Sequence, residues 1–173
     1  MIRSVKSNNQ NFKPVVFHPG FNIVLADRNR GSAAEEKRTR NGAGKTTLVE
    51  IIHFCLGSQI SRNSVFKHET LKGWSFILEI DIGAKTYCIE RFTDCPGKIY
   101  IDGELSYLDF DYKYDKVKHR YYVSPGTFNK LMLTEFYGIE TTDNNQQYIP
   151  SFRELISYAV RRNVEGYKNA FEF

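Results

Sequence analysis

A short glycine-rich turn between an apolar segment and a periodic helix constrains this chain more than any other feature. The turn spans residues 41–47 and reads Asn-Gly-Ala-Gly-Lys-Thr-Thr. It follows the apolar segment 21–26, which reads as a strand, and precedes apolar residues at helical spacing. The order of strand, glycine-rich turn, Lys-Thr and helix is typical of a loop that binds phosphate groups. The sequence therefore predicts an α/β fold with an anion site at this turn.

Each residue type in the turn has a physical part in such a site. Gly42 and Gly44 have no Cβ and tolerate positive φ, so backbone N–H groups can approach an anion closely. The following helix directs its free N–H groups and positive dipole end at the same point. Lys45 would contact the β- and γ-phosphates, Thr46 would coordinate Mg²⁺, and Thr47 would lie beside the α-phosphate. The predicted binding set is Asn41, Gly42, Ala43, Gly44, Lys45, Thr46 and Thr47.

The residues before the turn depart from the usual pattern. The first glycine of the motif is replaced by Thr39, and residues 28–40 form a long, charged insertion. Two interpretations stay open: a solvated insertion, or a segment that covers the nucleotide or meets a partner. Asp27 and Arg28 lie at the carboxyl end of the expected strand, where ligands of α/β sheets bind, and they complete the predicted site.

The segment after the turn predicts a helix that buries one face. Five apolar residues fall at i, i+3, i+4, i+7 and i+8, and Gly57 follows as the C′ residue. They are Leu48, Ile51, Ile52, Cys55 and Leu56. His53 falls outside this face and is expected on the surface.

The rest of the chain predicts much antiparallel sheet and two further helices. A second helix should begin with Ser124 as N-cap and Pro125 at N1 and end at Gly138, and a third should open with a capping box at residues 151–154. The Asp-Gly pair at 102–103 is a hairpin signal. Strands are expected at 2–6, 14–18, 21–26, 74–82, 85–92, 98–101 and 105–108.

Length and composition fit one globular domain over residues 1–173. The chain is 41% apolar and 14% aromatic, which excludes a disordered protein. Its net charge of +4 permits a phosphate-bearing partner. The three cysteines lack zinc-site spacing and are expected to be buried or idle thiols. No apolar run is long enough to cross a membrane and no signal peptide is recognised, so we expect a cytoplasmic protein without a membrane partner.

Several stretches together resemble the ATPase head of the SMC, RecN and RecF group of ABC-type ATPases. They are an amino-terminal hairpin, Phe-Asn-Ile-Val-Leu-Ala-Asp-Arg at 21–28, the phosphate loop continuing into Leu-Val-Glu-Ile-Ile, and a β-meander. Ile-Ile-His-Phe-Cys-Leu-Gly at 51–57 and Ser-Phe-Arg-Glu-Leu-Ile-Ser-Tyr at 151–158 further resemble little-characterised bacterial SMC-like proteins, some of which belong to multi-gene defence systems. The resemblance implies the first lobe of such a head, with an antiparallel β-meander and flanking helices.

The resemblance also implies a mechanism and partners. Heads of this group bind ATP and Mg²⁺, form a dimer with the nucleotides between two heads, and commonly act on DNA. The dimer needs a signature Ser-Gly-Gly segment, a Walker B Asp and a catalytic Glu, and none of these is found in this sequence. We therefore expect no catalytic residue here and no hydrolysis by this chain alone. The expected partners are a second lobe with a coiled coil, a second head, DNA and accessory subunits, and the chain is interpreted as a fragment or one part of a split protein.

The family's glutamine loop has no clear equivalent. The matching region carries Arg161 and Arg162, which are either a phosphate or DNA contact or the cationic last turn of a helix. Gln146 and Gln147 lie earlier, in a polar linker, where surface solvation is the favoured role.

Residues 110–122 interleave aromatic and basic side chains. This pattern suits a surface that stacks on nucleic acid, but an edge strand with one buried aromatic face is the favoured interpretation. Asp109, Asp111 and Asp115 lack the spacing of a calcium loop.

Two other functional classes remain as alternatives. A self-contained phosphate-loop kinase or GTPase would need its own Walker B Asp or a base-reading Asn-Lys-x-Asp, and the chain has only Asn-Lys-Leu-Met at 129–132. A non-hydrolysing nucleotide-binding module would explain Thr39 and the missing glutamine.

Overall fold

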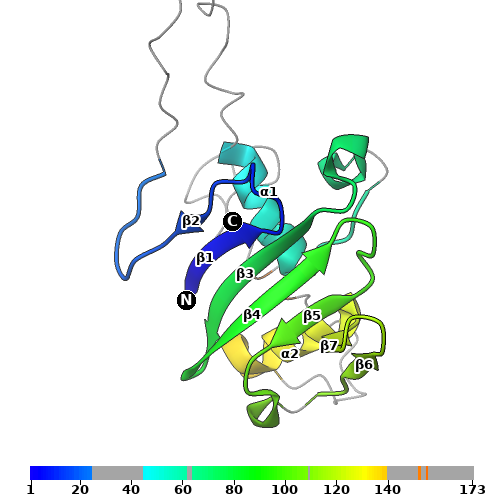
Figure 1. Cartoon of the computed structure of the whole chain (residues 1–173). Coiled ribbons are helices and arrows are strands. Elements are labelled where there is room, and N and C mark those ends of the chain that lie inside the picture. Colours follow the sequence, from blue (N-terminus) through cyan, green and yellow to red (C-terminus); the bar gives the residue numbers. More distant parts are fainter. Residues whose placement is uncertain (25–44, 62–63, 109, 140–151, 153–154, 156–173) are drawn as a thin grey trace, which may run out of the picture.

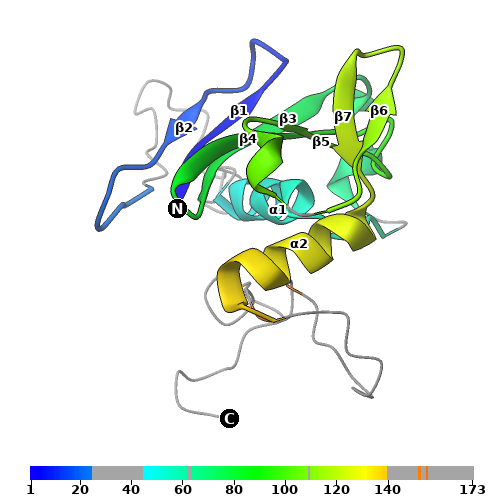
Figure 2. The ribbon, with the colours of Figure 1, turned by 90° about the horizontal axis from the view of Figure 1, so that it is seen from below.

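In the part of the chain that the structure describes, one antiparallel sheet carries two long helices on a single face (Figures 1 and 2). The computed structural model describes residues 1–24, 45–61, 64–108, 110–139, 152 and 155. Seven strands lie in the order β2-β1-β3-β4-β5-β7-β6, and each neighbouring pair is antiparallel. The strands are β1 Ile2–Ser7, β2 Val15–Val16, β3 Ser75–Ile82, β4 Lys85–Phe92, β5 Ile99–Asp102, β6 Lys113–Asp115 and β7 Arg120–Val123.

Helix α1 (Lys45–Cys55) packs against β3 and β4, and α2 (Pro125–Tyr137) follows β7. Three short 3₁₀ helices are η2 Val65–Lys67, η3 Glu69–Leu71 and η4 Leu105–Tyr107. Figure 2 shows α1 and α2 on the same side of the sheet. The α/β layering and the meander expected from the sequence are therefore present in the described part of the chain.

Strict alternation along β3 explains which side of the sheet carries the core. Phe76, Leu78 and Ile80 are buried toward the helices, as the period of two predicts. Strand β4 continues the pattern with Tyr87 and Ile89. Helix α1 covers this apolar face, and its own buried side chains complete the core.

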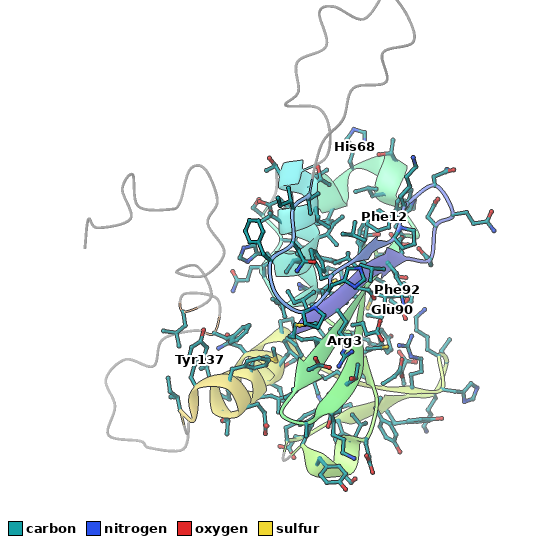
Figure 3. The ribbon with its side chains drawn as sticks, turned by 90° about the vertical axis from the view of Figure 1, so that its left-hand side faces the viewer. Arg3, Phe12, His68, Glu90, Phe92 and Tyr137 are labelled. Carbon is teal, nitrogen blue, oxygen red and sulfur yellow. The ribbon has the colours of Figure 1, made fainter. Side chains whose placement is uncertain are left out.

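The other face of the sheet is held by ionic and hydroxyl contacts. The Arg3 guanidinium donates to Asp81 at 2.6 Å, and this contact is the main reason that the pKa of Asp81 is lowered. Further along the face, Arg120 binds both Glu90 and Asp102. Figure 3 shows Arg3 and Glu90 on the side of the sheet away from α2. A sheet with one apolar and one polar face needs helices on one side only.

The capping signals of α2 act as the sequence predicts. The Ser124 hydroxyl accepts a hydrogen bond from the Thr127 N–H at 3.1 Å, and Pro125 occupies the first turn. Gly138 ends the helix with a φ of 63°. Of the predicted third helix, Phe152 and Leu155 are described and are helical, while the rest of its capping box lies outside the described residues.

Two predicted strands are wrong in the described residues, and a third is shorter than expected. Residues 105–108 form η4 and its cap instead of a strand, because β5 pairs with β7 rather than with the segment after Gly103. Residues 21–24 form no strand, because no other described strand pairs with them. The strand expected at 14–18 is reduced to Val15–Val16 at the sheet edge.

Candidate nucleotide-binding site

The amino-terminal end of α1 carries the described part of the predicted phosphate site. The helix begins at Lys45, so the last three residues of the glycine-rich motif, Lys45, Thr46 and Thr47, form its first turn. Thr46 and Thr47 are exposed in its first turn. The first N–H groups of a helix have no partner within it, and the dipole places partial positive charge there. This end therefore offers hydroxyl and N–H groups to an anion.

The other half of α1 is buried on every side. All six residues from Ile51 to Leu56 are buried, although only four of them lie on the apolar face expected from spacing. His53 is 3% exposed, so its predicted surface position is wrong. The Phe66 ring of η2 stacks on Phe54 with centroids 4.3 Å apart, which shows that the segment after α1 folds back over the helix. Because this end of the helix is buried on every side, the spacing of its apolar residues could not show that His53 is also buried.

Gly57 closes α1 in the manner predicted. Its φ is 88°, its N–H donates to the Phe54 carbonyl at 3.1 Å, and the Ser58 N–H donates to the His53 carbonyl at 3.0 Å. These two bonds form a Schellman motif. A Cβ at Gly57 would lie 3.4 Å from the Phe128 ring, so the turn also fits tightly against α2.

Arg91 of β4 fixes the same end of the helix. Its Nη1 donates to the carbonyls of Phe54 at 2.6 Å and Ser58 at 2.7 Å, and its Nε donates to the Pro96 carbonyl at 2.8 Å. The guanidinium also lies 4.6 Å from the centroid of the Phe54 ring. No carboxylate among the described residues pairs with it. Helix carbonyls and the negative end of the dipole take the place of a counter-ion.

Burial has a measurable effect on this arginine. Arg91 is 2% exposed, and desolvation lowers its pKa to about 10. It therefore remains charged at neutral pH. Sequence reasoning did not single out Arg91, although the alternation of β4 places it on the core face with Tyr87 and Ile89. A charged residue at an apolar position of a strand was the signal that could have identified it.

The three cysteines differ in burial, with Cys55 buried and Cys88 and Cys95 partly exposed. All three cysteines are unpaired. The Cys55 Sγ lies 3.5 Å from the Phe76 carbonyl oxygen, and burial raises the pKa of this thiol to about 12. No His, Cys, Asp or Glu cluster that could hold a metal ion occurs within the described ranges.

Much of the predicted site lies outside the described residues. This holds for Asp27, Arg28, the insertion 28–40, and the turn residues Asn41, Gly42, Ala43 and Gly44. It also holds for Gln146, Gln147, Arg161 and Arg162. The structure therefore places the helical part of the site, and the remaining residues stay predictions.

The described residues 21–24 of the segment that leads to the glycine-rich motif are exposed. The exposed fractions are 90% for Phe21, 67% for Ile23 and 45% for Val24. Three large apolar side chains in four residues have no covering element among the described residues. Such a patch is typical of a surface that another polypeptide segment covers.

Comparison with protein families gives one match, a model described as an AAA domain, over residues 2–164. The chain belongs to this AAA domain family. The match supports a phosphate-loop nucleoside triphosphatase of the SMC- and RecN-like group, and with it ATP binding and the use of Mg²⁺. Comparison with curated proteins and with solved structures gave no match.

None of the helices in the described part of the chain combines the length and apolar character needed to span a bilayer.

Proposed function

We propose that this AAA domain is the ATP-binding lobe of an SMC-like ABC-type ATPase head. One observation carries the proposal: α1 begins at Lys45, exposes Thr46 and Thr47, and is held rigidly at its far end by Arg91 and the turn at Gly57. A fixed helix with an open amino terminus after a Gly-Ala-Gly turn is the arrangement that a triphosphate needs.

In the proposed site each residue has a separate part. The Lys45 ammonium neutralises the β- and γ-phosphates, the Thr46 hydroxyl completes the shell of Mg²⁺, and backbone N–H groups of residues 42–47 contact phosphate oxygens. The magnesium ion would supply charge neutralisation between the β- and γ-phosphates. The chain itself binds and orients the nucleotide.

The exposed segment at Phe21, Ile23 and Val24 supports a second lobe. These apolar side chains are exposed and residues 21–24 pair with no described strand, as expected of a surface that another polypeptide segment covers. We assign that segment to a second lobe joined through a coiled coil. Hydrolysis then requires that lobe and a second head, and the complete particle acts on DNA, with further subunits, in repair or defence.

The test compares this chain alone with the chain plus the second lobe supplied in trans. We expect the isolated chain to bind Mg-ATP without releasing phosphate, and the reconstituted head to form an ATP-dependent dimer, measured by light scattering. A chain that binds no ATP would contradict the site. Steady phosphate release by the isolated chain would instead favour a self-contained kinase or GTPase. Nucleotide binding without dimerisation or hydrolysis in the reconstituted head would favour a non-hydrolysing module.

A further inference from the structure

An exposed row of tyrosines lies on the hairpin formed by β6 and β7, far along the sheet from β1. Tyr112, Tyr114 and Tyr121 are 46%, 50% and 42% exposed. The Tyr121 ring centroid lies 5.0 Å from that of Tyr112 and 5.2 Å from that of Tyr114. The aromatic face of this edge is therefore open, and the buried aromatic face favoured from the sequence is wrong for these three residues.

Strand register explains why the rings share a face. Tyr114 pairs directly with Tyr121, so their side chains project to the same side of the sheet. Val123, two residues further along β7, is on that side too and is buried in the core. The row thus continues the core face beyond the point where α1 and α2 cover it, as Figure 2 shows for the hairpin at the sheet's edge.

The exposed charges around the row are mostly basic, although Asp111 is exposed beside Tyr112. Lys113 and Lys116 are exposed, and neither forms an ion pair within the described part of the chain. Lys113 pairs with Tyr122 and therefore projects to the opposite face of the hairpin from the three tyrosines, whereas Lys116 lies in the turn after β6. The nearby carboxylate of Asp115 accepts from Lys98 at 2.7 Å and from the Tyr100 hydroxyl at 2.8 Å, and these bonds lower its pKa. Because its charge is already neutralised, Asp115 does not repel an approaching anion.

The tip of the hairpin is shaped by the same carboxylate. The Asp115 Oδ1 accepts from the N–H groups of Val117 at 2.9 Å and Lys118 at 3.2 Å, and His119 follows with a φ of 53°. These two hydrogen bonds hold the turn, which leaves Val117 89% exposed. The tyrosine row therefore sits on a braced support, which lowers the ordering cost of binding.

Aromatic rings in a row beside unpaired lysines match one ligand chemistry best. Bases have flat faces that stack on exposed rings, and their phosphates pair with lysine. A duplex hides its base faces, so the rings favour single strands. We propose that the tyrosine row, Tyr112, Tyr114 and Tyr121, binds single-stranded nucleic acid by stacking, with Lys116 of the hairpin turn contacting a phosphate. This extends the DNA role proposed above and does not depend on the nucleotide site.

The test measures anisotropy of a labelled dT15, rU15 or 15-base-pair duplex with the full chain, without ATP. Both single strands should bind more tightly than the duplex. The single strand with the higher affinity, dT15 or rU15, shows whether DNA or RNA is the preferred ligand. The double change Tyr114→Ala and Tyr121→Ala should weaken single-strand binding roughly tenfold to a hundredfold. Tyr114→Phe should keep most of the affinity, because the ring remains. Lys116→Gln should reduce the salt dependence by about one counter-ion.

Tyr107→Ala is the matched control. Tyr107 is 62% exposed on η4, lies under Lys85, and is not part of the row. It should leave oligonucleotide affinity unchanged, as should Lys45→Ala, whereas the double tyrosine change should leave ATP affinity unchanged. Equal binding of single strands by the wild type and the double variant would overturn the proposal. So would preferential binding of an acidic peptide, because that would make the hairpin a protein-docking surface.

Discussion

The two ends of α1 are built in opposite ways. At the carboxyl end every residue from Ile51 to Leu56 is buried, Gly57 closes the helix with two backbone bonds, and Arg91 binds its carbonyls. At the amino end Thr46 and Thr47 are exposed. The contacts that stabilise the helix therefore lie at its carboxyl end, and the groups that are open for binding lie at its amino end.

This difference teaches how a small domain can hold a binding end in place without burying it. A helix is stiff, so fixing its far end also fixes the direction of its first turn. The N–H groups of that turn can then stay free for a ligand, at no cost to the core. Changes at the carboxyl end should therefore act on folding, and changes at the amino end on binding alone.

The largest effect is expected for Arg91→Met. It removes the guanidinium donor from the buried carbonyls of Phe54 and Ser58 and from the partly buried carbonyl of Pro96. We expect a loss of roughly 3–5 kcal/mol in the free energy of unfolding, measured by urea denaturation. Arg91→Lys should lose less, because an ammonium can still donate to two carbonyls.

Arg3→Met is the matched control for that change. Arg3 also binds through its Nε, but to Asp81 on the polar face and in contact with solvent. Its loss should be much smaller, because water replaces the contact. Equal losses for the two variants would show that Arg91 does not anchor α1.

The second prediction concerns the amino end. Lys45→Ala removes a charge-assisted phosphate contact worth about 1.5–3 kcal/mol, so ATP affinity should fall roughly tenfold to a hundredfold by calorimetric titration. Its unfolding free energy should stay close to that of the wild type. Lys6→Ala removes an ammonium from the polar face of the sheet. It should change neither the ATP affinity nor the free energy of unfolding. Unchanged ATP affinity in Lys45→Ala would contradict the site.

Local signals were sufficient for much of this fold. The Ser124 cap, Pro125 and Gly138 mark α2 to within a residue, and alternation marks β3 and β4. Gly57 was identified as the stop of α1 for the same reason: a turn that needs positive φ selects glycine. These features depend on neighbours in sequence, so the sequence reveals them.

Long-range contacts account for what was missed. The turn at Gly103 is real, with a φ of 144°, but β5 takes its partner from β7, beyond η4, and no local pattern encodes that choice. His53 is buried by contacts that helical spacing does not report. Arg91 was missed because its partners are carbonyls, and carbonyls carry no sequence signature.

A third change tests whether the helix stop must be glycine. Gly57→Ala places a Cβ on a residue with a φ of 88° and brings it 3.4 Å from the Phe128 ring. We expect a loss of about 1–2 kcal/mol in unfolding free energy. Gly97→Ala is the control, because no atom lies within 4 Å of its added Cβ and its φ is not positive. If the two variants were equally stable, the Schellman turn would not contribute to the anchored end.

The smallest expected effect is on the pH dependence of the unfolding free energy, through Cys55 in the buried half of α1. Burial raises the pKa of Cys55 to about 12, while an unfolded thiol titrates near about 8.5. Between these values the unfolded chain binds fewer protons than the folded one, so stability falls as pH rises. From pH 9 to 10 the wild type should lose about 1 kcal/mol more than Cys55→Ala in denaturant titrations, since each pKa unit is worth about 1.4 kcal/mol. The buried tyrosines, whose pKa values are also raised, titrate alike in both proteins and cancel in the difference. If the unfolding free energies of the wild type and Cys55→Ala fell equally with pH, the Cys55 thiol would be in contact with water. The carboxyl end of α1 would then not be the closed end described above.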